Sequence, residues 1–214
     1  MSPWHDIEME SKCDEEYTLT GVIEITQNTT KKLECMKELP HNPIMQDYKK
    51  NEDGKYIHRS YVKAPQFNYG FIPQTWCDDS CGGDADAIDL VDLSWKELKP
   101  ILAVSDYLVL GMIGLVDQGE LDYKVLAIEI NEARHRNITS LDTYKRQNPG
   151  HIEQIQVWFR DYKTWEGKQQ NKFLWSGEIL NQEKSLELIR ESSYQYKALW
   201  EDPHFTENKD YWKA

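Results

Sequence analysis

Two apolar runs separated by a turn signal constrain the fold of this chain more than any other feature. Tyr107–Val116 (YLVLGMIGLV) is a continuous apolar run with two glycines, which is typical of a buried, bent strand. Lys124–Ile130 (KVLAIEI) predicts a second strand, and Gly119 marks a turn in the connection of residues 117–123. The middle of the chain is therefore expected to fold as two buried strands joined by a turn.

The order of the remaining patterns sets the fold class. Tyr17–Thr26 is rich in β-branched residues and partly alternates, so it predicts an early strand. From Ser140 onward the apolar spacing favours helices. The helical patterns comprise Leu141, Tyr144, Ile152, Ile155, Phe159 and Tyr162, and then Leu186, Ile189, Tyr196, Leu199 and Trp200. Strands followed by helices predict an α+β protein or a small barrel with appended helices. We expect one domain over residues 1–200 and a surface-docked or flexible tail over 201–214.

An acidic motif directly after two glycines carries the first functional signal. Asp84, Asp86 and Asp89 alternate with Ala, Ile and Leu, unlike a solvated acidic run. An extended backbone would place Asp84 and Asp86 on one face, and a kink after them could bring Asp89 to the same side. Clustered carboxylates repel one another unless cations lie between them, and hard divalent cations prefer carboxylate oxygen. The motif predicts a metal site.

A second acidic cluster lies at the turn between the two apolar runs. Asp117, Asp122 and Lys124 are displayed there, and this pattern alone is typical of a solvated turn. Together, the two clusters supply five aspartates that could hold two or more divalent cations, which can activate water and neutralise a phosphate oxyanion. Phosphate also needs cations and hydroxyl donors. The candidates are Lys32, Arg59, Lys124, Lys163, Tyr69 and Tyr162.

The charge and hydropathy of the chain argue against several classes of protein. The formal net charge is −12, which argues against general binding of nucleic acid or of anionic membranes, because both need a positive field. No run of 18 apolar residues is present, so the sequence predicts no transmembrane helix. The first residues lack the basic and apolar regions of a secretory signal.

Several ordered motifs together resemble those of soluble family I inorganic pyrophosphatases of the eukaryotic type. Residues 84–89 are similar to the D-x-D-x-x-D signature of that family, and residues 117–124 to its D-x-G-E-x-D-x-K element. Residues 158–163 resemble the helical W-F-x-x-Y-K segment, and residues 68–76 match its NYG…PQTW stretch. Residues 4–7 and 176–178 fit the same branch, so that the resemblance runs from about Trp4 to Trp200.

The resemblance implies an OB-like five-stranded β-barrel with flanking C-terminal helices and a Mg²⁺-dependent inorganic diphosphatase that hydrolyses pyrophosphate to two orthophosphates. It implies that Asp86 accepts the proton of the attacking water. The implied metal ligands are Asp84, Asp89, Asp117 and Asp122, with Glu24 and Glu34 at the rim. The implied substrate-binding residues are Lys32, Arg59, Tyr69, Lys124, Tyr162 and Lys163, of which Tyr69, Lys32 and Arg59 join Asp86 in the expected catalytic set. Mn²⁺, Zn²⁺ or Co²⁺ are expected to substitute for Mg²⁺, and Ca²⁺ to inhibit.

The chain also departs from the family pattern, which identifies it as a divergent member. Ala87 stands where the signature usually has Pro, and Pro65 where a second Tyr is usual. Thr26-Gln27 replaces Pro-Arg, and the spacing from Arg59 to Tyr69 is short. This altered rim makes a hydrolase of tripolyphosphate or short polyphosphates the nearest alternative. A non-catalytic binding module and an oligonucleotide-binding barrel are further alternatives.

Assembly and location are expectations from the resemblance alone. It implies a homodimer or a higher homo-oligomer. We expect a cytoplasmic location. A mitochondrial location, or one in an acidic phosphate-storing organelle, is the alternative if a leader or a further domain is missing.

Overall fold

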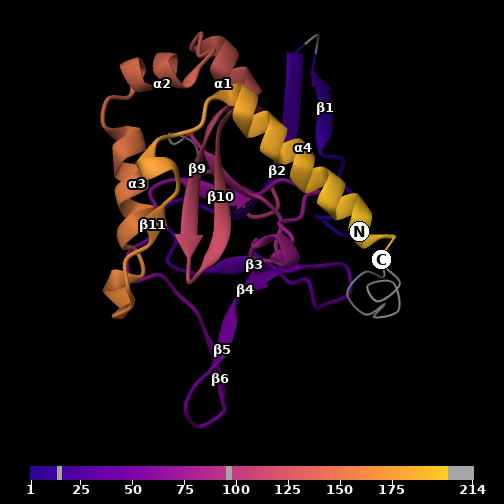
Figure 1. The fold of residues 1–214 in the computed structure, drawn as a ribbon, viewed down its shortest axis with the longest axis vertical. Coiled ribbons are helices and arrows are strands. Elements are labelled where there is room, and N and C mark those ends of the chain that lie inside the picture. The colour runs from indigo at the N-terminus through magenta and orange to yellow at the C-terminus, as the bar shows by residue number, and fades with distance from the viewer. Residues whose placement is uncertain (14–15, 95–97, 202–214) are drawn as a thin grey trace.

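The computed structural model describes residues 1–13, 16–94 and 98–201, in which every strand except the short β11 precedes the α-helices along the chain (Figure 1). The strands are β1 (Glu10–Cys13), β2 (Glu16–Ile25), β3 (Leu33–Cys35), β4 (Ile44–Gln46), β5 (Tyr48–Lys50), β6 (Tyr56–His58), β7 (Asn68–Phe71), β8 (Asp89–Asp92), β9 (Val104–Asp117), β10 (Glu120–Glu129) and β11 (Lys172–Phe173). The α-helices are α1 (Ile130–His135), α2 (Leu141–Gln147), α3 (His151–Asp161) and α4 (Gln182–Leu199). Single 3₁₀ turns are η1 (Asp79–Cys81), η2 (Thr164–Glu166) and η3 (Trp175–Gly177).

Strands β2, β7, β8, β10 and β9 close into a ring, because β9 pairs with β10 along one edge and with β2 along the other. β8 and β10 are parallel, and the other neighbours in the ring are antiparallel. β1 and β11 extend the sheet beyond the ring. The α+β class and the OB-like ring of five strands with C-terminal helices are thus confirmed.

A glycine lets two strands of the ring approach closely. A Cβ atom on Gly70 of β7 would lie 1.8 Å from the carbonyl oxygen of Val22 on β2. Any larger residue would push the strands apart, so this glycine is required for the close contact. β2 also pairs with β9, from Leu19↔Tyr107 to Val22↔Val104, and Val22 pairs with both β7 and β9. These pairings close the ring.

The central hairpin has the predicted turn but longer strands than predicted. Gln118 and Gly119 both have positive φ, which gives a two-residue turn that matches the twist of the flanking strands. β9 therefore reaches Asp117 and β10 begins at Glu120, so the expected seven-residue connection over 117–123 is wrong. The consequence is functional, because Asp122 is held by a rigid strand rather than by a turn.

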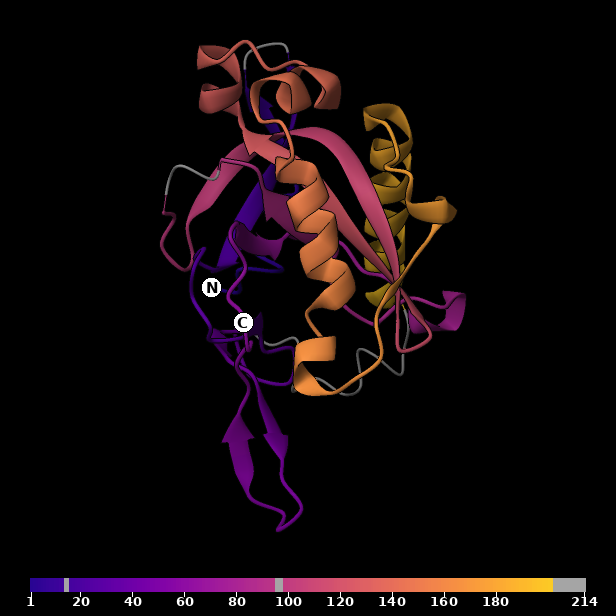
Figure 2. The same ribbon diagram turned by 90° about the vertical axis from the view of Figure 1, so that its left-hand side faces the viewer.

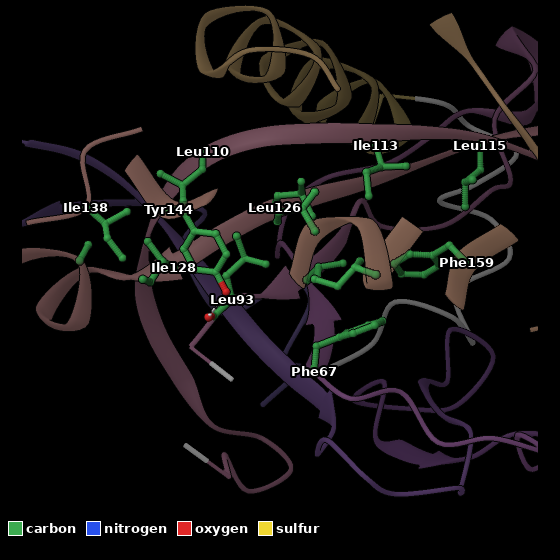
Figure 3. Close-up of a cluster of buried hydrophobic side chains, with 14 residues drawn as sticks. Phe67, Leu93, Leu110, Ile113, Leu115, Leu126, Ile128, Ile138, Tyr144 and Phe159 are labelled. Atoms are coloured by element: carbon green, nitrogen blue, oxygen red, sulfur yellow. Dashed lines mark hydrogen bonds between the residues drawn. The ribbon is translucent and has the colours of Figure 1, made fainter. Parts of the chain in front are cut away.

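Helices cover the sheet with two apolar clusters. One cluster packs residues from α1, α2 and α3 against β8, β9 and β10, and within it the Tyr144 hydroxyl donates to the Leu93 carbonyl at 3.0 Å (Figure 3). Its members include Phe67, Leu93, Leu110, Ile113, Leu126, Tyr144 and Phe159. A second cluster packs Ile189 of α4 against residues of β2, β8, β9 and β10. In Figure 1, α4 crosses the sheet diagonally, on a different side of the molecule from α3.

The predicted helices are confirmed, although Tyr162 and Trp200 lie just beyond the ends of α3 and α4. The hairpin β5–β6 projects away from the rest of the molecule in both ribbon views (Figures 1 and 2). Among the described residues, no helix is both long and apolar enough to cross a membrane. The tail predicted to be surface-docked or flexible lies, from residue 202 onward, outside the described residues.

Candidate active site

Three aspartates from different segments meet at one end of the ring. One carboxylate oxygen from each of Asp84, Asp89 and Asp122 lies within 4.8 Å of the others. Asp89 begins β8, and its parallel partner on β10 is Lys124, two residues after Asp122. Asp84 follows Gly83, which bridges to Leu121 of β10 and leaves no room for a side chain, because a Cβ atom there would lie 2.5 Å from the Cys77 carbonyl oxygen. Strand pairing thus brings the three carboxylates together.

The path of the chain through the acidic motif differs from the expected extended one. Ala85 has a φ of 53°, so the kink lies between Asp84 and Asp86 rather than after both of them. Asp84 joins the cluster with Asp89 and Asp122, whereas the Asp86 carboxylate accepts the Ala87 N–H at 2.8 Å. Both Asp84 and Asp86 still line the same cavity. The kink gives the two carboxylates different environments.

The electrostatics of this cluster fit a cation. Burial, followed by repulsion from Asp122 and Asp86, raises the pKa of Asp84 to about 7. Burial and the neighbouring Asp122 and Asp84 carboxylates raise the pKa of Asp89 well above its ordinary range, although Lys124 opposes the shift. Among the described residues, the buried Oδ1 atom of Asp84 has no hydrogen-bond donor. Carboxylates that repel one another around an unsatisfied oxygen are suited to a divalent cation.

A buried lysine already compensates part of this negative charge. Lys124 forms ion pairs with Asp89 and, at 2.5 Å, with Asp122, and its ammonium group lies 2.8 Å from the Tyr69 hydroxyl. Burial alone would lower the pKa of Lys124, but Asp122 and Asp89 raise it well above its ordinary value. The lysine therefore stays charged beside the cluster, where it can also attract a phosphate oxygen.

Asp117 lies on the same cavity wall but outside the three-carboxylate cluster. It ends β9, accepts the Tyr162 hydroxyl at 3.1 Å and forms an ion pair with Lys163. Tyr162 follows the last residue of α3, so the end of this helix directs both side chains toward Asp117. The Trp158 ring also lines the cavity. The predicted residues Asp117, Tyr162 and Lys163 therefore meet at this wall.

β2 and β3 also contribute residues to the cavity. Glu24 is buried, and its carboxylate accepts the Cys35 N–H at 2.6 Å. Burial, with the nearby Asp89, Asp86 and Glu34 carboxylates, raises the pKa of Glu24 well above its ordinary value. Lys32 forms an ion pair with Glu34. These three predicted residues line the cavity, which has a volume of about 140 Å³.

The predicted residue Arg59 forms an ion pair beside the cavity. Its guanidinium lies 2.6 Å from the Asp47 carboxylate, which in turn lies 3.4 Å from Lys32. Asp47 therefore links Arg59 to Lys32, and neither Arg59 nor Lys163 is among the described residues that line the cavity.

Two further residues of this region are not predicted by the sequence motifs. Tyr61 is 8% exposed, lines the cavity and packs edge-on against Trp158 at 5.2 Å between ring centroids. Lys37 lies 3.2 Å from the Asp86 carboxylate. Burial would lower the pKa of Lys37, but Asp86, Asp84 and Glu38 raise it. Neither residue belongs to a recognised motif, and only the spacing of Lys37, three residues after Glu34, could have drawn attention to it.

Comparison with known proteins supports one reading of this geometry. The family model described as inorganic pyrophosphatase matches residues 21–197. This chain belongs to that family. It is 32% identical to mouse inorganic pyrophosphatase 2, mitochondrial, over 93% of this chain and 66% of the mouse protein. It is 33% identical to human inorganic pyrophosphatase over 93% of this chain and 70% of the human protein. The predicted family is confirmed, and the chain spans about two thirds of these curated relatives.

Solved structures of this family superimpose closely. The type I inorganic pyrophosphatase from Toxoplasma gondii matches with a TM-score of 0.85 and 32% identity, over 93% of this chain and 88% of that one. An N-terminally truncated vacuolar soluble pyrophosphatase from Trypanosoma cruzi, solved in complex with PPi, matches with a TM-score of 0.86 and 30% identity. That match covers 94% of this chain and 80% of the other.

Proposed function

We propose that this protein is a divalent-cation-dependent inorganic diphosphatase that hydrolyses pyrophosphate to two orthophosphates. The observation that carries the proposal is the convergence of Asp84, Asp89 and Asp122 beside the buried Lys124, in a cavity that also holds Asp86. Family membership and the likeness to a pyrophosphatase solved with PPi support it. Retention of all five predicted aspartates argues against a non-catalytic module.

The cation would be held by Asp84, Asp89 and Asp122, with Asp117 and the rim carboxylates Glu24 and Glu34 available for further ions. Mg²⁺ suits this oxygen-only donor set, with Mn²⁺, Zn²⁺ or Co²⁺ as substitutes and Ca²⁺ as an inhibitor. When bound, such a cation lowers the pKa of water and neutralises phosphate charge. Binding of cations would also weaken the hold of the carboxylates on Lys124 and Lys163, so that both lysines become available to phosphate oxygens.

Other side chains of this protein accept the proton and bind the phosphates. Asp86 accepts the proton of the attacking water, because a carboxylate that is half-exposed to the cavity can take it at an oxygen atom. Lys32, Lys124 and Lys163 bind the negative phosphates as cations, and Tyr69 and Tyr162 donate hydrogen bonds to them. Arg59, which is linked to Lys32 through Asp47, is a further cation expected to bind phosphate.

The decisive experiment measures orthophosphate release from pyrophosphate with Mg²⁺, after chelation, and after Mg²⁺ is restored. We expect rapid release that stops with chelator and returns with the metal. The absence of release in saturating Mg²⁺ from folded protein would contradict the proposed function.

The position of Arg59 favours a second candidate substrate. Arg59 is ion-paired with Asp47, and Pro65 and Thr26-Gln27 depart from the family pattern. Tripolyphosphate or a short polyphosphate could then extend past the rim. Comparing turnover of pyrophosphate and tripolyphosphate tests this, since robust hydrolysis of tripolyphosphate without any of pyrophosphate would replace the first proposal.

Assembly and location remain proposals from the family. We infer a homodimer or higher homo-oligomer, which sedimentation velocity would test. We also infer a cytoplasmic location, although the names of the mouse and Trypanosoma cruzi relatives include mitochondrial and vacuolar. Imaging of the full-length protein in its own cells would distinguish a cytoplasmic from a mitochondrial or acidic-organelle location.

A further inference from the structure

We propose that Lys37 is a positioning residue that holds the Asp86 carboxylate in its reactive orientation; this inference rests on the proposed function. Lys37 follows β3, whereas Asp86 belongs to the acidic loop before β8. Its ammonium group lies 3.2 Å from Oδ2 of Asp86 and also donates to the carbonyl oxygen of Ala85. One cation thus holds both the side chain of Asp86 and the peptide group immediately before it.

Asp86 needs such a support because its half-exposed side chain has few other contacts that orient the carboxylate. The side chain is 44% exposed, and Oδ1 accepts the Ala87 N–H at 2.8 Å. The backbone is anchored separately, since the Cys77 N–H donates to the Asp86 carbonyl at 2.7 Å and the Ala85 N–H donates to the Cys77 carbonyl at 2.9 Å. These hydrogen bonds fix the position of the Asp86 backbone. The one hydrogen bond to Oδ1, however, does not by itself fix the orientation of the carboxylate. The contact with Lys37 fixes the second oxygen.

The loop conformation adds a second reason. Ala85 has a φ of 53°, a region that is unfavourable for a residue with a side chain. The Lys37 ammonium bonds to the carbonyl oxygen of this same residue. The contact therefore stabilises the kink that separates Asp84, in the carboxylate cluster, from Asp86, the proposed proton acceptor.

Lys37 is itself held in place by packing. Its ammonium group lies 5.5 Å from the centre of the Trp76 ring. Trp76 stacks on Trp4 with ring centroids 5.5 Å apart, and its backbone N–H donates to the Ser192 hydroxyl of α4 at 2.9 Å. The side-chain amide of Asn42 donates to the Lys37 carbonyl at 3.3 Å. Because both the backbone and the ammonium group of Lys37 are held, its side chain loses little further conformational entropy when it contacts Asp86.

Lys37 differs in this respect from the lysines assigned to phosphate. Lys124 and Lys163 form ion pairs with candidate metal ligands, and their ammonium groups would be released when cations bind. The partner of Lys37 is the proton acceptor instead, which lies outside the three-carboxylate cluster, so binding of cations there does not release the Lys37 ammonium group. Loss of Lys37 should therefore lower the rate of the chemical step and leave binding of cation and substrate intact.

The test compares Lys37→Met, Lys37→Gln and Lys37→Arg with wild type and with Lys49→Met, a control at an exposed lysine of β5. We expect Lys37→Met to lower kcat by about 10- to 100-fold, since small misplacement of a reacting group costs on this scale. KM for pyrophosphate and the affinity for Mn²⁺, read by electron paramagnetic resonance, should stay within about twofold of wild type. Lys37→Arg should recover most of the rate, because it can contact the same two oxygens.

A double-mutant cycle with Asp86→Asn separates positioning from general damage to the fold. If Lys37 acts through Asp86, adding Lys37→Met to Asp86→Asn should change the residual rate by less than about twofold. An equal loss in both backgrounds, or a loss of Mn²⁺ affinity that matches the loss of rate, would overturn the inference. Should circular dichroism show that Lys37→Met is unfolded, the comparison of Lys37→Gln with Lys37→Arg decides, and equal rates in these two overturn it.

The wild-type assay distinguishes failure of this inference from failure of the proposed function. An active wild type with an equally active, folded Lys37→Met variant overturns the role of Lys37 alone. A folded wild type that releases no orthophosphate in Mg²⁺ overturns both.

Discussion

The indole of Trp158 stacks on the ring of Tyr162, with ring centroids 4.9 Å apart and 5° between the ring planes. The two residues are four apart at the end of α3, so they lie on the same face of that helix. The Trp158 Nε1–H donates to the Lys63 carbonyl at 3.2 Å, and the Tyr162 hydroxyl donates to Asp117 at 3.1 Å. The stacked pair thus connects the outer loop at Lys63 to the cavity and fixes the direction of a hydroxyl expected to bind phosphate.

Replacing Trp158 with Leu should therefore weaken substrate binding more than it slows the chemistry. An aromatic pair contributes about 0.5–1.5 kcal/mol beyond burial, so KM for pyrophosphate should rise by about 2- to 10-fold with a smaller change in kcat. Trp165→Leu is the matched control, because Trp165 packs against Lys63 outside the catalytic cavity. Steady-state kinetics of both variants test this. An unchanged KM in folded Trp158→Leu would mean that Tyr162 does not contact the substrate.

Asp86→Asn should separate proton transfer from metal binding. An amide cannot take the proton, and general base catalysis contributes about 10²- to 10⁴-fold, so kcat should fall on this scale. Mn²⁺ affinity should be retained broadly, because Asp86 lies outside the cluster of Asp84, Asp89 and Asp122. Asp79→Asn, at an exposed aspartate of η1, is the control for a change of charge nearby. A near-normal rate in Asp86→Asn would exclude the assigned role.

Asp122→Asn should act on the metal requirement instead. Asp122 belongs to the three-carboxylate cluster, and even an outer partner of a metal ligand contributes about 10- to 100-fold to affinity. The Mg²⁺ concentration for half-maximal activity should rise by at least about tenfold, with part of the rate restored at high Mg²⁺. Glu120→Gln, at the exposed start of the same strand, should behave as wild type. Titration of activity with Mg²⁺ decides, and identical titrations for wild type and Asp122→Asn would remove Asp122 from the metal site.

Local patterns were enough to predict the parts of the site that lie close together in sequence. Gln118 and Gly119 encode a turn by their conformational preference, and Asp84 and Asp89 are five residues apart, so one loop and one strand place both. The ring itself depends on the pairing of β2 with β9, whose partners Leu19 and Tyr107 are far apart in sequence. Periodicity predicts that both segments are strands but gives no information on which strands pair. The five-stranded ring was therefore expected only through the family resemblance.

Sequence patterns did not predict the remaining residues of the site, for a different reason. Lys37 and Tyr61 reach the site through loops after β3 and β6, where no periodicity fixes the direction of a side chain. Arg59 shows the same limit, since its spacing along the chain does not predict its ion pair with the Asp47 carboxylate. The direction of such side chains depends on where their partners lie in the folded protein. Spacing along the sequence does not predict these positions.

Metal affinity should depend on pH because the cation must displace a proton. Burial and the neighbouring carboxylates raise the pKa of Asp84 to about 7, and a metal ligand must be deprotonated. The affinity for Mn²⁺ should thus rise by about tenfold per pH unit for each displaced proton below pH 7 and level off above it. Calorimetry in buffers of different ionisation enthalpy measures the released protons. An affinity that stays constant from about pH 5.5 to 8 would contradict a raised pKa at this site.

The aromatic contact between the N-terminus and α4 should make the metal-free protein less stable in mild acid. His5 stacks on Trp4 at 4.5 Å between ring centroids, and its Nδ1 lies 2.9 Å from the Tyr196 hydroxyl. Burial lowers the pKa of His5 to about 4, although Asp6 opposes the shift. The unfolded chain, with a pKa of about 6.5 for histidine, binds this proton more readily than the folded one, so the stabilisation is complete above that pH and is lost as the pH falls toward 4.

Urea unfolding in the presence of chelator tests this linkage. His5→Asn keeps a polar partner for Tyr196 but removes the titration, so its free energy of unfolding should fall less than that of wild type between about pH 7 and 5. His58→Asn, at an exposed histidine of the projecting hairpin, should follow wild type at every pH. Parallel curves for wild type and His5→Asn would show that His5 titrates normally in the folded protein. A curve for His58→Asn that matched His5→Asn would assign the acid sensitivity to histidine content in general.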